Sequence, residues 1–320
     1  GLLSDDLSMP IRGVSRAMSQ VMELIRKVAP TSATVLITGE SGTGKELVAH
    51  AIHALSKRAQ HPFIALNCGS FSEALISSEL LGHARGAFTG AVMDRAGLIR
   101  EAGKGTLFLD EIATTKQNFQ IVLLRVLEQR MARPVGAGAE YPVACRFIAA
   151  ANRDLGRMAA EGEFREDLFY RLNMFNIHLP PLRERREDIP VLTNFFLLQA
   201  SQEYGKKVNG ISAEALRQLE EAPWPGNVRQ LRNAVERAVI LAEDHVLERR
   251  DFALPPALAV GHSDPLALPD ADFDQAMADY ERRLLAEAMR QAGGNVSEAA
   301  RRLGMKRPRL CYRLKLLGLA

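Results

Sequence analysis

The chain has 320 residues, 47% of them hydrophobic and 25% charged, which is ordinary for a globular protein and enough for two or three domains. No apolar run is long enough to cross a bilayer and no signal-peptide pattern opens the sequence, so membrane insertion and secretion are not expected. Three cysteines, Cys68, Cys145 and Cys311, lie far apart without metal-ligand spacing, as reduced thiols of a cytoplasmic protein do.

The positive charge is concentrated near the C-terminus. Between Asn295 and Ala320 seven lysines and arginines stand against one acid, Glu298, which gives a local net charge of +6. Because the whole chain carries +3, the remaining residues sum to −3. Such a basic segment is typical of a nucleic-acid-binding module, although a solvated basic helix has the same composition.

Five short runs in the first 180 residues are almost continuously apolar. They occupy 34–38 (TVLIT), 63–67 (FIALN), 106–110 (TLFLD), 146–150 (RFIAA) and 175–179 (FNIHL). Continuous apolar runs are typical of parallel strands that are covered on both faces. Helical patterns lie between them, for example over 45–56 and 116–130. The alternation predicts a three-layer α/β domain with a parallel sheet over residues 1–186.

The strand signal stops after residue 186. The following stretches have the 3.6-residue period of helices, and they predict a small all-helical domain over 187–253. Residues 254–272 are rich in Pro, Ala and Asp without a period, as expected of a linker. From Phe273 the pattern is helical again, so a third domain is predicted over 273–320.

The segment GESGTGKE directly follows the first apolar run and opens a helical pattern. It fits the Gly-x-x-x-x-Gly-Lys core of a phosphate-binding loop, in the strand–loop–helix context that the motif requires. Its glycines let backbone N–H groups converge on phosphate oxygens, and Lys45 adds a charge for the β- and γ-phosphates. The eighth position holds Glu46 instead of Ser or Thr, which departs from the strict consensus. The expected nucleotide-binding residues are Gly39, Glu40, Ser41, Gly42, Thr43, Gly44, Lys45 and Glu46.

A second motif supports a nucleotide site. In GTLFLDEI, Asp110 and Glu111 stand at the end of an apolar run. Asp110 can hold Mg²⁺ through its water shell, and Glu111 can polarise the water that attacks the γ-phosphate. An isolated Asp-Glu pair is usually a strand end that meets solvent, but here a phosphate loop precedes it. Together the two motifs predict binding of ATP and Mg²⁺.

Residues 85–91 read RGAFTGA, which is poor material for a helix or a strand because glycine weakens both. We expect a loop that carries the Phe88 ring at or near its tip. One interpretation is a tight turn whose ring folds back onto the core. The other is an apolar contact offered to a partner protein.

Six motifs in one order carry a family resemblance: GESGTGKE, RGAFTGA, GTLFLDEI, FREDLFYRLN, LPPLRERREDIP and WPGNVRQLRN. From about residue 12 to 250 the sequence resembles the AAA+ ATPase domain of bacterial enhancer-binding activators that work with the sigma-54 form of RNA polymerase. The C-terminal segment resembles the Fis-type helix-turn-helix of that family. The resemblance implies a P-loop AAA+ domain, an all-α lid, a DNA-binding domain and a place in the bacterial cytoplasm.

The resemblance also implies roles for single residues. Glu46 is usual at its position in this family. Asn67 would be the switch residue that holds Glu111 away from water until the γ-phosphate is sensed. Arg165 and Arg171 would be arginine fingers that reach the nucleotide of a neighbouring subunit.

Two further residues would complete the nucleotide site. Arg229 would be the sensor arginine of the lid, and Asn152 would sense phosphate from the end of the fourth strand. The family usually reads Ala-Thr-Asn there, whereas this chain has Ala151 in place of the threonine. That departure leaves the coupling of hydrolysis to movement unpredicted.

The family assembles into a ring, so the resemblance implies a homo-oligomer, a hexamer when active and a dimer when inactive. The GAFTGA stretch is the family signature, and it would bind sigma-54 through Phe88 as an apolar contact and Thr89 as a hydrogen-bonding one. Glycines at each end would let the loop move with the nucleotide state. The predicted partner loop comprises Gly86, Ala87, Phe88, Thr89, Gly90 and Ala91.

The basic C-terminal segment has the pattern of a helix-turn-helix. Ser297 and Glu298 start a short helix, Leu303 and Gly304 make the turn, and Pro308 suits the first turn of a second helix. The first residues of a recognition helix contact bases, whereas other basic residues bind phosphates. Departures from the family pattern leave the DNA sequence unpredicted. The predicted DNA contacts are Lys306, Arg307, Arg309 and Arg313, with Arg307 and Arg309 on bases and Arg313 on phosphate.

The sequence therefore predicts an ATP-hydrolysing activator that binds upstream double-stranded enhancer DNA, forms a ring and remodels sigma-54 RNA polymerase to the open complex. One alternative is another AAA+ remodeller, such as a protein unfoldase or a helicase loader, but the 86–91 loop and the DNA-binding segment argue against it. A repressor with a vestigial ATPase fold is the other, and intact Lys45, Asp110 and Glu111 argue against that.

Overall fold

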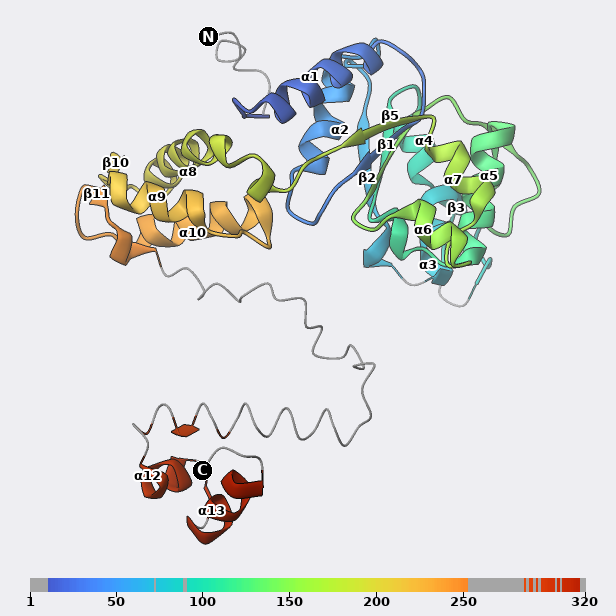
Figure 1. The fold of residues 1–320 in the computed structure, drawn as a ribbon. Helices are drawn as coiled ribbons and strands as arrows, with labels where there is room; N and C mark the ends of the chain where they lie inside the picture. Colours follow the sequence, from blue (N-terminus) through green and yellow to red (C-terminus); the bar gives the residue numbers. More distant parts are fainter. Residues whose placement is uncertain are drawn as a thin grey trace. The chain divides into compact units, whose positions relative to one another are not determined.

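The computed structural model describes residues 11–71, 73–88 and 91–252, and in the C-terminal part residues 285, 288–289, 292, 295–302, 304–305 and 307–316. The chain divides into two compact units, Gly1–Ala257 and Leu258–Ala320 (Figure 1). The predicted linker over 254–272 lies outside the described residues.

A five-stranded parallel sheet forms the centre of the first unit (Figure 1). Its strand order is β2-β5-β8-β1-β9, and each strand coincides with a predicted apolar run to within one residue. Because the strands are parallel, their carboxyl ends share one edge, where Asn67 pairs with Asp110 in register. The strands are β1 (Val35–Thr38), β2 (Phe63–Asn67), β5 (Thr106–Asp110), β8 (Arg146–Ala151) and β9 (Phe175–His178).

Helices cover both faces of this sheet, which confirms the predicted three-layer fold. Val35 and Ile37 pack with α1 and α2, whereas Leu36 between them belongs to the core formed with α3 to α7. Successive strand side chains point to opposite faces, so a continuous apolar run fills both cores. The helices are α1 (Arg16–Val28), α2 (Lys45–Ala54), α3 (Glu73–Leu81), α4 (Leu98–Ala102), α5 (Gln117–Gln129), α6 (Leu155–Ala160) and α7 (Glu166–Leu172).

Helix α1 is not among the elements predicted from the sequence, although its apolar side chains follow a helical period. Ser15 caps its N-terminus by accepting a hydrogen bond from Met18 N at 3.3 Å. At the other end, buried Arg146 donates to the backbone oxygens of Val28, Ala29 and Ala33, at 3.0, 2.9 and 3.0 Å. These bonds satisfy carbonyls at the end of α1 and in the segment before β1, and they fix α1 against the sheet.

The rest of the first unit is a helical lid that has its own apolar core. Trp224 is buried in it and donates its ring N–H to Leu219 O at 2.7 Å. The lid was predicted to be all-helical, but two-residue strands, β10 (Gly210–Ile211) and β11 (Val246–Leu247), pair beside its helices. The lid helices are α8 (Ile189–Glu203), α9 (Ala213–Glu221) and α10 (Asn227–Leu241).

In the second unit, the described residues include α12 (Val296–Arg302) and α13 (Arg307–Leu316), joined through Gly304 at φ 65°. Asn295 Oδ1 accepts from the backbone N–H groups of Ser297 and Glu298 and so caps α12. Ala299 and Ala300 pack with Leu310 and Leu314, while Leu303, predicted to lie in the turn, is outside the described residues. None of the described helices is both long and apolar enough to cross a membrane.

Candidate active site

The predicted phosphate loop connects β1 to α2, which begins at Lys45. The loop therefore stands at a helix N-terminus, where unpaired backbone N–H groups favour an anion. Gly42 has φ 77°, and a Cβ on it would lie 2.3 Å from the backbone oxygen of Gly226. Only glycine fits here, so the loop and the lid approach each other closely.

A cavity of about 290 Å³ opens beside the loop. Its walls come from the loop, the carboxyl ends of β5 and β8, and the start of α10, which are far apart in the sequence. The predicted site residues that line it are Ser41, Gly42, Gly44, Lys45, Glu46, Asp110, Glu111, Asn152 and Arg229. Gly39, Glu40, Thr43 and Asn67 do not line it.

Lys45 lies among charged groups in this cavity. Its ammonium donates to the backbone oxygens of Gly39 and Glu40, at 2.8 and 2.9 Å. Burial lowers the pKa of Lys45. The negative charges of Asp110 and Glu111 oppose this shift, whereas the positive charge of Arg229 adds to it. A bound phosphate would supply the negative charge that favours the protonated lysine.

Asp110 is the last residue of strand β5 and Glu111 follows it directly, and both are half-buried. Asp110 Oδ1 accepts from Glu111 N at 2.8 Å, and Glu111 itself has a left-handed backbone with φ 53°. The Glu111 carboxylate lies over Gly69, where a Cβ would be 2.5 Å from Oε2. The same Cβ would be 3.3 Å from Asn67 Oδ1, so the predicted switch residue lies next to this carboxylate. Asn67 Oδ1 accepts from Gly69 N at 2.8 Å.

The lid contributes more to the site than the sequence analysis predicted. Arg229 donates its Nη1 to Ser41 Oγ at 3.3 Å and its backbone N–H to Gly42 O at 3.2 Å. Arg183 and Asn227, which the sequence analysis did not select, bind the Glu40 carboxylate. Both residues stand within quoted motifs, LPPLRERREDIP and WPGNVRQLRN, but the motifs do not show the contacts with Glu40, which span 143 and 187 positions of the chain.

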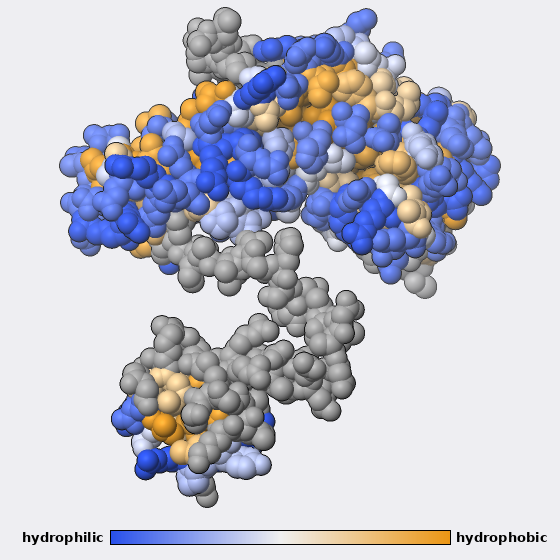
Figure 2. All heavy atoms as spheres, in the orientation of Figure 1, coloured by the Kyte–Doolittle hydropathy of each residue, from blue (hydrophilic) through white to orange (hydrophobic). Residues whose placement is uncertain are grey.

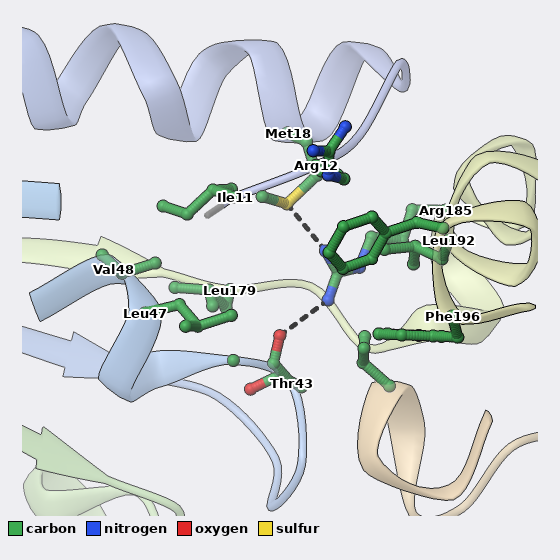
Figure 3. Close-up of a pocket in the computed structure, with 13 residues that line it drawn as sticks. Ile11, Arg12, Met18, Thr43, Leu47, Val48, Leu179, Arg185, Leu192 and Phe196 are labelled. Carbon is green, nitrogen blue, oxygen red and sulfur yellow. Dashed lines mark hydrogen bonds between the residues drawn. The ribbon is translucent and has the colours of Figure 1, made fainter. Parts of the chain in front are cut away.

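A second, smaller cavity of about 70 Å³ adjoins the end of the phosphate loop (Figure 3). Leu47 and Val48 of α2 line one side, and Leu192 and Phe196 of α8 line another. Arg185 is buried between them and donates to Thr43 O and to the Met18 sulfur, both at 2.9 Å. On the face drawn in Figure 2, apolar surface gathers over α1, α2 and the sheet. The cavity therefore offers an apolar site next to the phosphate loop.

The two predicted arginine fingers lie on α7, outside the cavity of their own subunit. Arg165 is at the N-cap of this helix and pairs with Asp167, at 3.0 and 2.6 Å. Arg171 is exposed and donates to Leu127 O at 3.2 Å.

The predicted partner loop lies at the end of a short antiparallel ladder, β3 (Gly82–His83) with β4 (Arg95–Ala96). The Phe88 ring is half-buried and meets the His83 ring edge-on, with centroids 5.0 Å apart. Val92 and Met93, just beyond the loop, are 78% and 71% exposed. Thr89 and Gly90 lie outside the described residues.

A second short ladder supports this loop, β6 (Met131–Ala132) with β7 (Tyr141–Pro142). Between those strands, Val135 exchanges backbone hydrogen bonds with Gly82 and Ala84, each at 2.9 Å. Within the loop, Gly86 N donates to Ala91 O at 2.9 Å. The loop is therefore held at its base and partly folded back, with Phe88 resting on His83.

The predicted DNA-contacting residues fall on α13 where they are described. Arg307 and Arg309 are exposed in its first turn, and Arg313 is half-buried one turn further on. Lys306 lies outside the described residues.

A phosphate loop at the edge of a parallel sheet, an acidic pair on a neighbouring strand and an arginine from a helical lid define the class of P-loop ATPases. Residues 11–178 match the family described as "Sigma-54 interaction domain", 183–265 match "AAA+ ATPase lid domain", and 276–316 match "Bacterial regulatory protein, Fis family". The chain belongs to the sigma-54 interaction domain family. It is a sigma-54-dependent transcription activator with an AAA+ ATPase and a DNA-binding helix-turn-helix.

Individual relatives agree with this assignment. The chain is 45% identical over 306 residues to the transcriptional regulatory protein ZraR of Klebsiella oxytoca, which covers 94% of this chain and 68% of that protein. It is 47% identical over 298 residues to the nitrogen fixation protein VnfA of Azotobacter vinelandii, covering 92% and 56%. A crystal structure of NtrX from Brucella abortus in complex with ATP has a TM-score of 0.73 and 36% identity, covering 97% of this chain and 69% of NtrX.

Proposed function

We propose that this activator binds upstream double-stranded DNA through residues 273–320, forms a ring, and hydrolyses ATP to remodel sigma-54 RNA polymerase in the bacterial cytoplasm. Residues 1–186 would be the ATPase subdomain and 187–253 its lid. The observation that carries the proposal is the cavity in which Lys45, Asp110, Glu111 and Arg229 meet. Crystals of NtrX from Brucella abortus with ATP and with ADP support nucleotide binding by a related protein.

The cavity residues have separate tasks in this proposal. The loop amides and Lys45 bind the phosphates, and Arg229 adds a positive charge from the lid. Carboxylate oxygens and water are the ligands that Mg²⁺ prefers. Asp110 carries such a carboxylate beside the lysine, so it would hold the ion through water. The ion would neutralise charge on the phosphates. Glu111 orients and polarises the attacking water, and Asn152 senses the γ-phosphate.

The apolar cavity in Figure 3 suits the adenine ring. It adjoins Thr43 and Gly44 at the end of the phosphate loop, and its walls of Leu47, Val48 and Phe196 can bury a flat apolar group. Both the α/β part and α8 of the lid contribute to it. Base binding would therefore favour one position of the lid.

Assembly would complete the site. Arg165 and Arg171 lie away from the cavity of their own subunit, which supports their action on a neighbour's ATP. Fingers of this kind contribute roughly three to five orders of magnitude in rate in related phosphoryl-transfer enzymes. We infer a hexameric ring in the active state and a dimer in the inactive state.

The 86–91 loop would carry the contact with sigma-54. Phe88 rests on His83 in this structure, so engagement would require the ring to leave that position. Loops on a rigid scaffold commonly carry such contacts, and the ladder of β3 and β4 supplies the scaffold here.

An open-complex assay tests the proposal. Phe88→Ala and Thr89→Ala should keep the ATPase rate, because both change the partner loop and Phe88 does not line the cavity, and should abolish open-complex formation with sigma-54 polymerase. Leu241→Ala, which trims another exposed apolar side chain on the lid, is the control and should behave as the parent chain. Transcription that persists in both loop variants, at unchanged thermal stability, would show that the partner contact lies elsewhere.

A further inference from the structure

Glu40, the second residue of the phosphate loop, directs its side chain to the segment between β9 and α8 and to the lid helix α10. Its carboxylate accepts from Arg183 Nη2 at 2.7 Å and Nη1 at 2.9 Å. Asn227 Nδ2 donates a third hydrogen bond at 3.1 Å. Arg183 is the main cause that lowers the pKa of Glu40, so the pair is charged at neutral pH. A bidentate arginine–carboxylate pair fixes geometry as well as adding energy.

The backbone of the same residue binds the lysine of the site. Glu40 O accepts from Lys45 Nζ at 2.9 Å and from Thr43 Oγ1 at 2.8 Å. Glu40 is thus bonded to the phosphate-binding lysine through its carbonyl and to Arg183 and Asn227 through its carboxylate. A shift of the loop at Lys45 must therefore move the groups on the far side of Glu40 or break these bonds.

Asn227 is built into this contact and is not a mobile surface group. It is fully buried at the first position of α10 and has a left-handed backbone with φ 52°. Its Nδ2 also donates to Ser41 O at 3.0 Å, and its Oδ1 accepts from Leu182 N at 2.8 Å. A strained conformation persists when the surroundings over-determine it, and here every polar side-chain atom is used.

From this arrangement we propose that Glu40 is a positioning residue for ATP hydrolysis, which couples the lid to the phosphate loop through Arg183 and Asn227. Arg229 lies two residues beyond Asn227 and lines the nucleotide cavity. The same coupling therefore holds Arg229 in a fixed position relative to Lys45. An isolated exposed ion pair contributes little to stability. Here, however, three hydrogen bonds converge on the Glu40 carboxylate and join the phosphate loop to the lid, so the Glu40–Arg183 pair acts in nucleotide binding.

The test is a double-mutant cycle on the full chain, with Glu40→Gln, Arg183→Met and the double variant. Each single change should weaken ADP binding roughly fivefold by calorimetry, within the usual range of coupling between sites. The double variant should be no weaker than either single one, because both remove the same contact. The KM for ATP should rise by about the same factor as the affinity for ADP falls, while kcat changes less. Arg183→Lys should restore part of the affinity.

Hydrogen exchange supplies a readout that a structural defect would not mimic. In the parent chain ADP should protect both the loop, 39–46, and the start of α10, 226–231. At saturating ADP the variants should keep loop protection and lose that of α10. Glu161→Gln, which breaks the exposed pair with Arg157 on another helix, is the control and should match the parent.

Additive losses in the double variant would overturn the proposal, as would parental ADP affinity with parental protection of α10. If Glu40→Gln does not fold, the exposed Arg183 variants decide the matter by the same two measurements.

Discussion

At the scale of single residues, Glu111 combines chemistry with backbone strain. A left-handed backbone at a non-glycine residue costs about 1–3 kcal/mol and persists where its surroundings require it. Here it brings the carboxylate over Gly69, beside Asn67, at the edge of the sheet where β2 and β5 end. A larger side chain at position 69 would collide with Oε2, so a small residue there is part of the site.

Glu111→Gln should keep ATP binding and remove most turnover. The amide preserves the shape of the side chain but cannot accept a proton, and general-base catalysis contributes about a hundred- to ten-thousandfold in rate. Calorimetry with ATP and a steady-state ATPase assay on one preparation measure the two effects. Glu101→Gln, on the exposed side of α4, should change neither. Loss of binding in proportion to turnover would contradict the role assigned to Glu111.

The sequence predicted those site residues whose role follows from the motif in which each one stands. Lys45, Asp110 and Arg229 were all expected at the nucleotide, and they line one cavity. Arg183 and Asn227 lie in two of the quoted motifs but were not selected, because the sequence does not show that the fold brings them to Glu40. Glu40 is predicted to bind the nucleotide as part of the phosphate loop, and its carboxylate binds these two residues.

At the scale of elements, α1 shows how a buried charge can fix a helix. Arg146 begins β8, is 1% exposed, and donates to the backbone oxygens of Val28 and Ala29 at the end of α1 and of Ala33 in the segment before β1. Burial lowers the pKa of Arg146 to about 10, which reflects the cost of keeping the guanidinium out of water. The hydrogen bonds to the helix end offset that cost.

Arg146→Met should lower the free energy of unfolding by about 2 kcal/mol, because it removes the three hydrogen bonds that the buried guanidinium donates to backbone oxygens. Urea denaturation followed by circular dichroism gives this value. Arg157→Met is the matched control, since it removes an exposed arginine that pairs only with a neighbour one turn away, and it should leave the midpoint unchanged. Equal midpoints for the two variants would mean that Arg146 does not fix α1.

The elements that the sequence predicted are those with a strong local pattern. All five sheet strands come from almost continuously apolar runs, so the runs were visible in the sequence. The three inner strands, β5, β8 and β1, are largely buried, whereas the edge strands β2 and β9 are partly exposed. The ladders β3–β4 and β6–β7 have two residues per strand, too few for a period to register. The base of the 86–91 loop is made of these ladders, so its fixed conformation could not be predicted.

At the scale of the whole molecule, the apolar cores of the two units share no residue. The core of the described C-terminal part consists of Leu285, Ala299, Ala300, Leu310 and Leu314, whereas the lid and the sheet have cores of their own. Units with separate cores can fold separately. ATP hydrolysis and DNA recognition should therefore be separable by cutting the chain.

A chain that ends after Ala271 should keep its ATPase activity and lose sequence-specific DNA binding, because α12 and α13 are removed while the first unit stays intact. Binding to specific and random duplexes, measured across a salt series, separates base reading from phosphate contact.

In the full chain, Arg307→Gln or Arg309→Gln should each make the free energy of DNA binding less favourable by about 1–3 kcal/mol and relax specificity at one base position. Arg313→Gln should weaken all duplexes alike and reduce the salt slope by about one. Arg301→Gln, on exposed α12 beside Glu298, is the control. Specific binding by the shortened chain would place the DNA reader in the first unit.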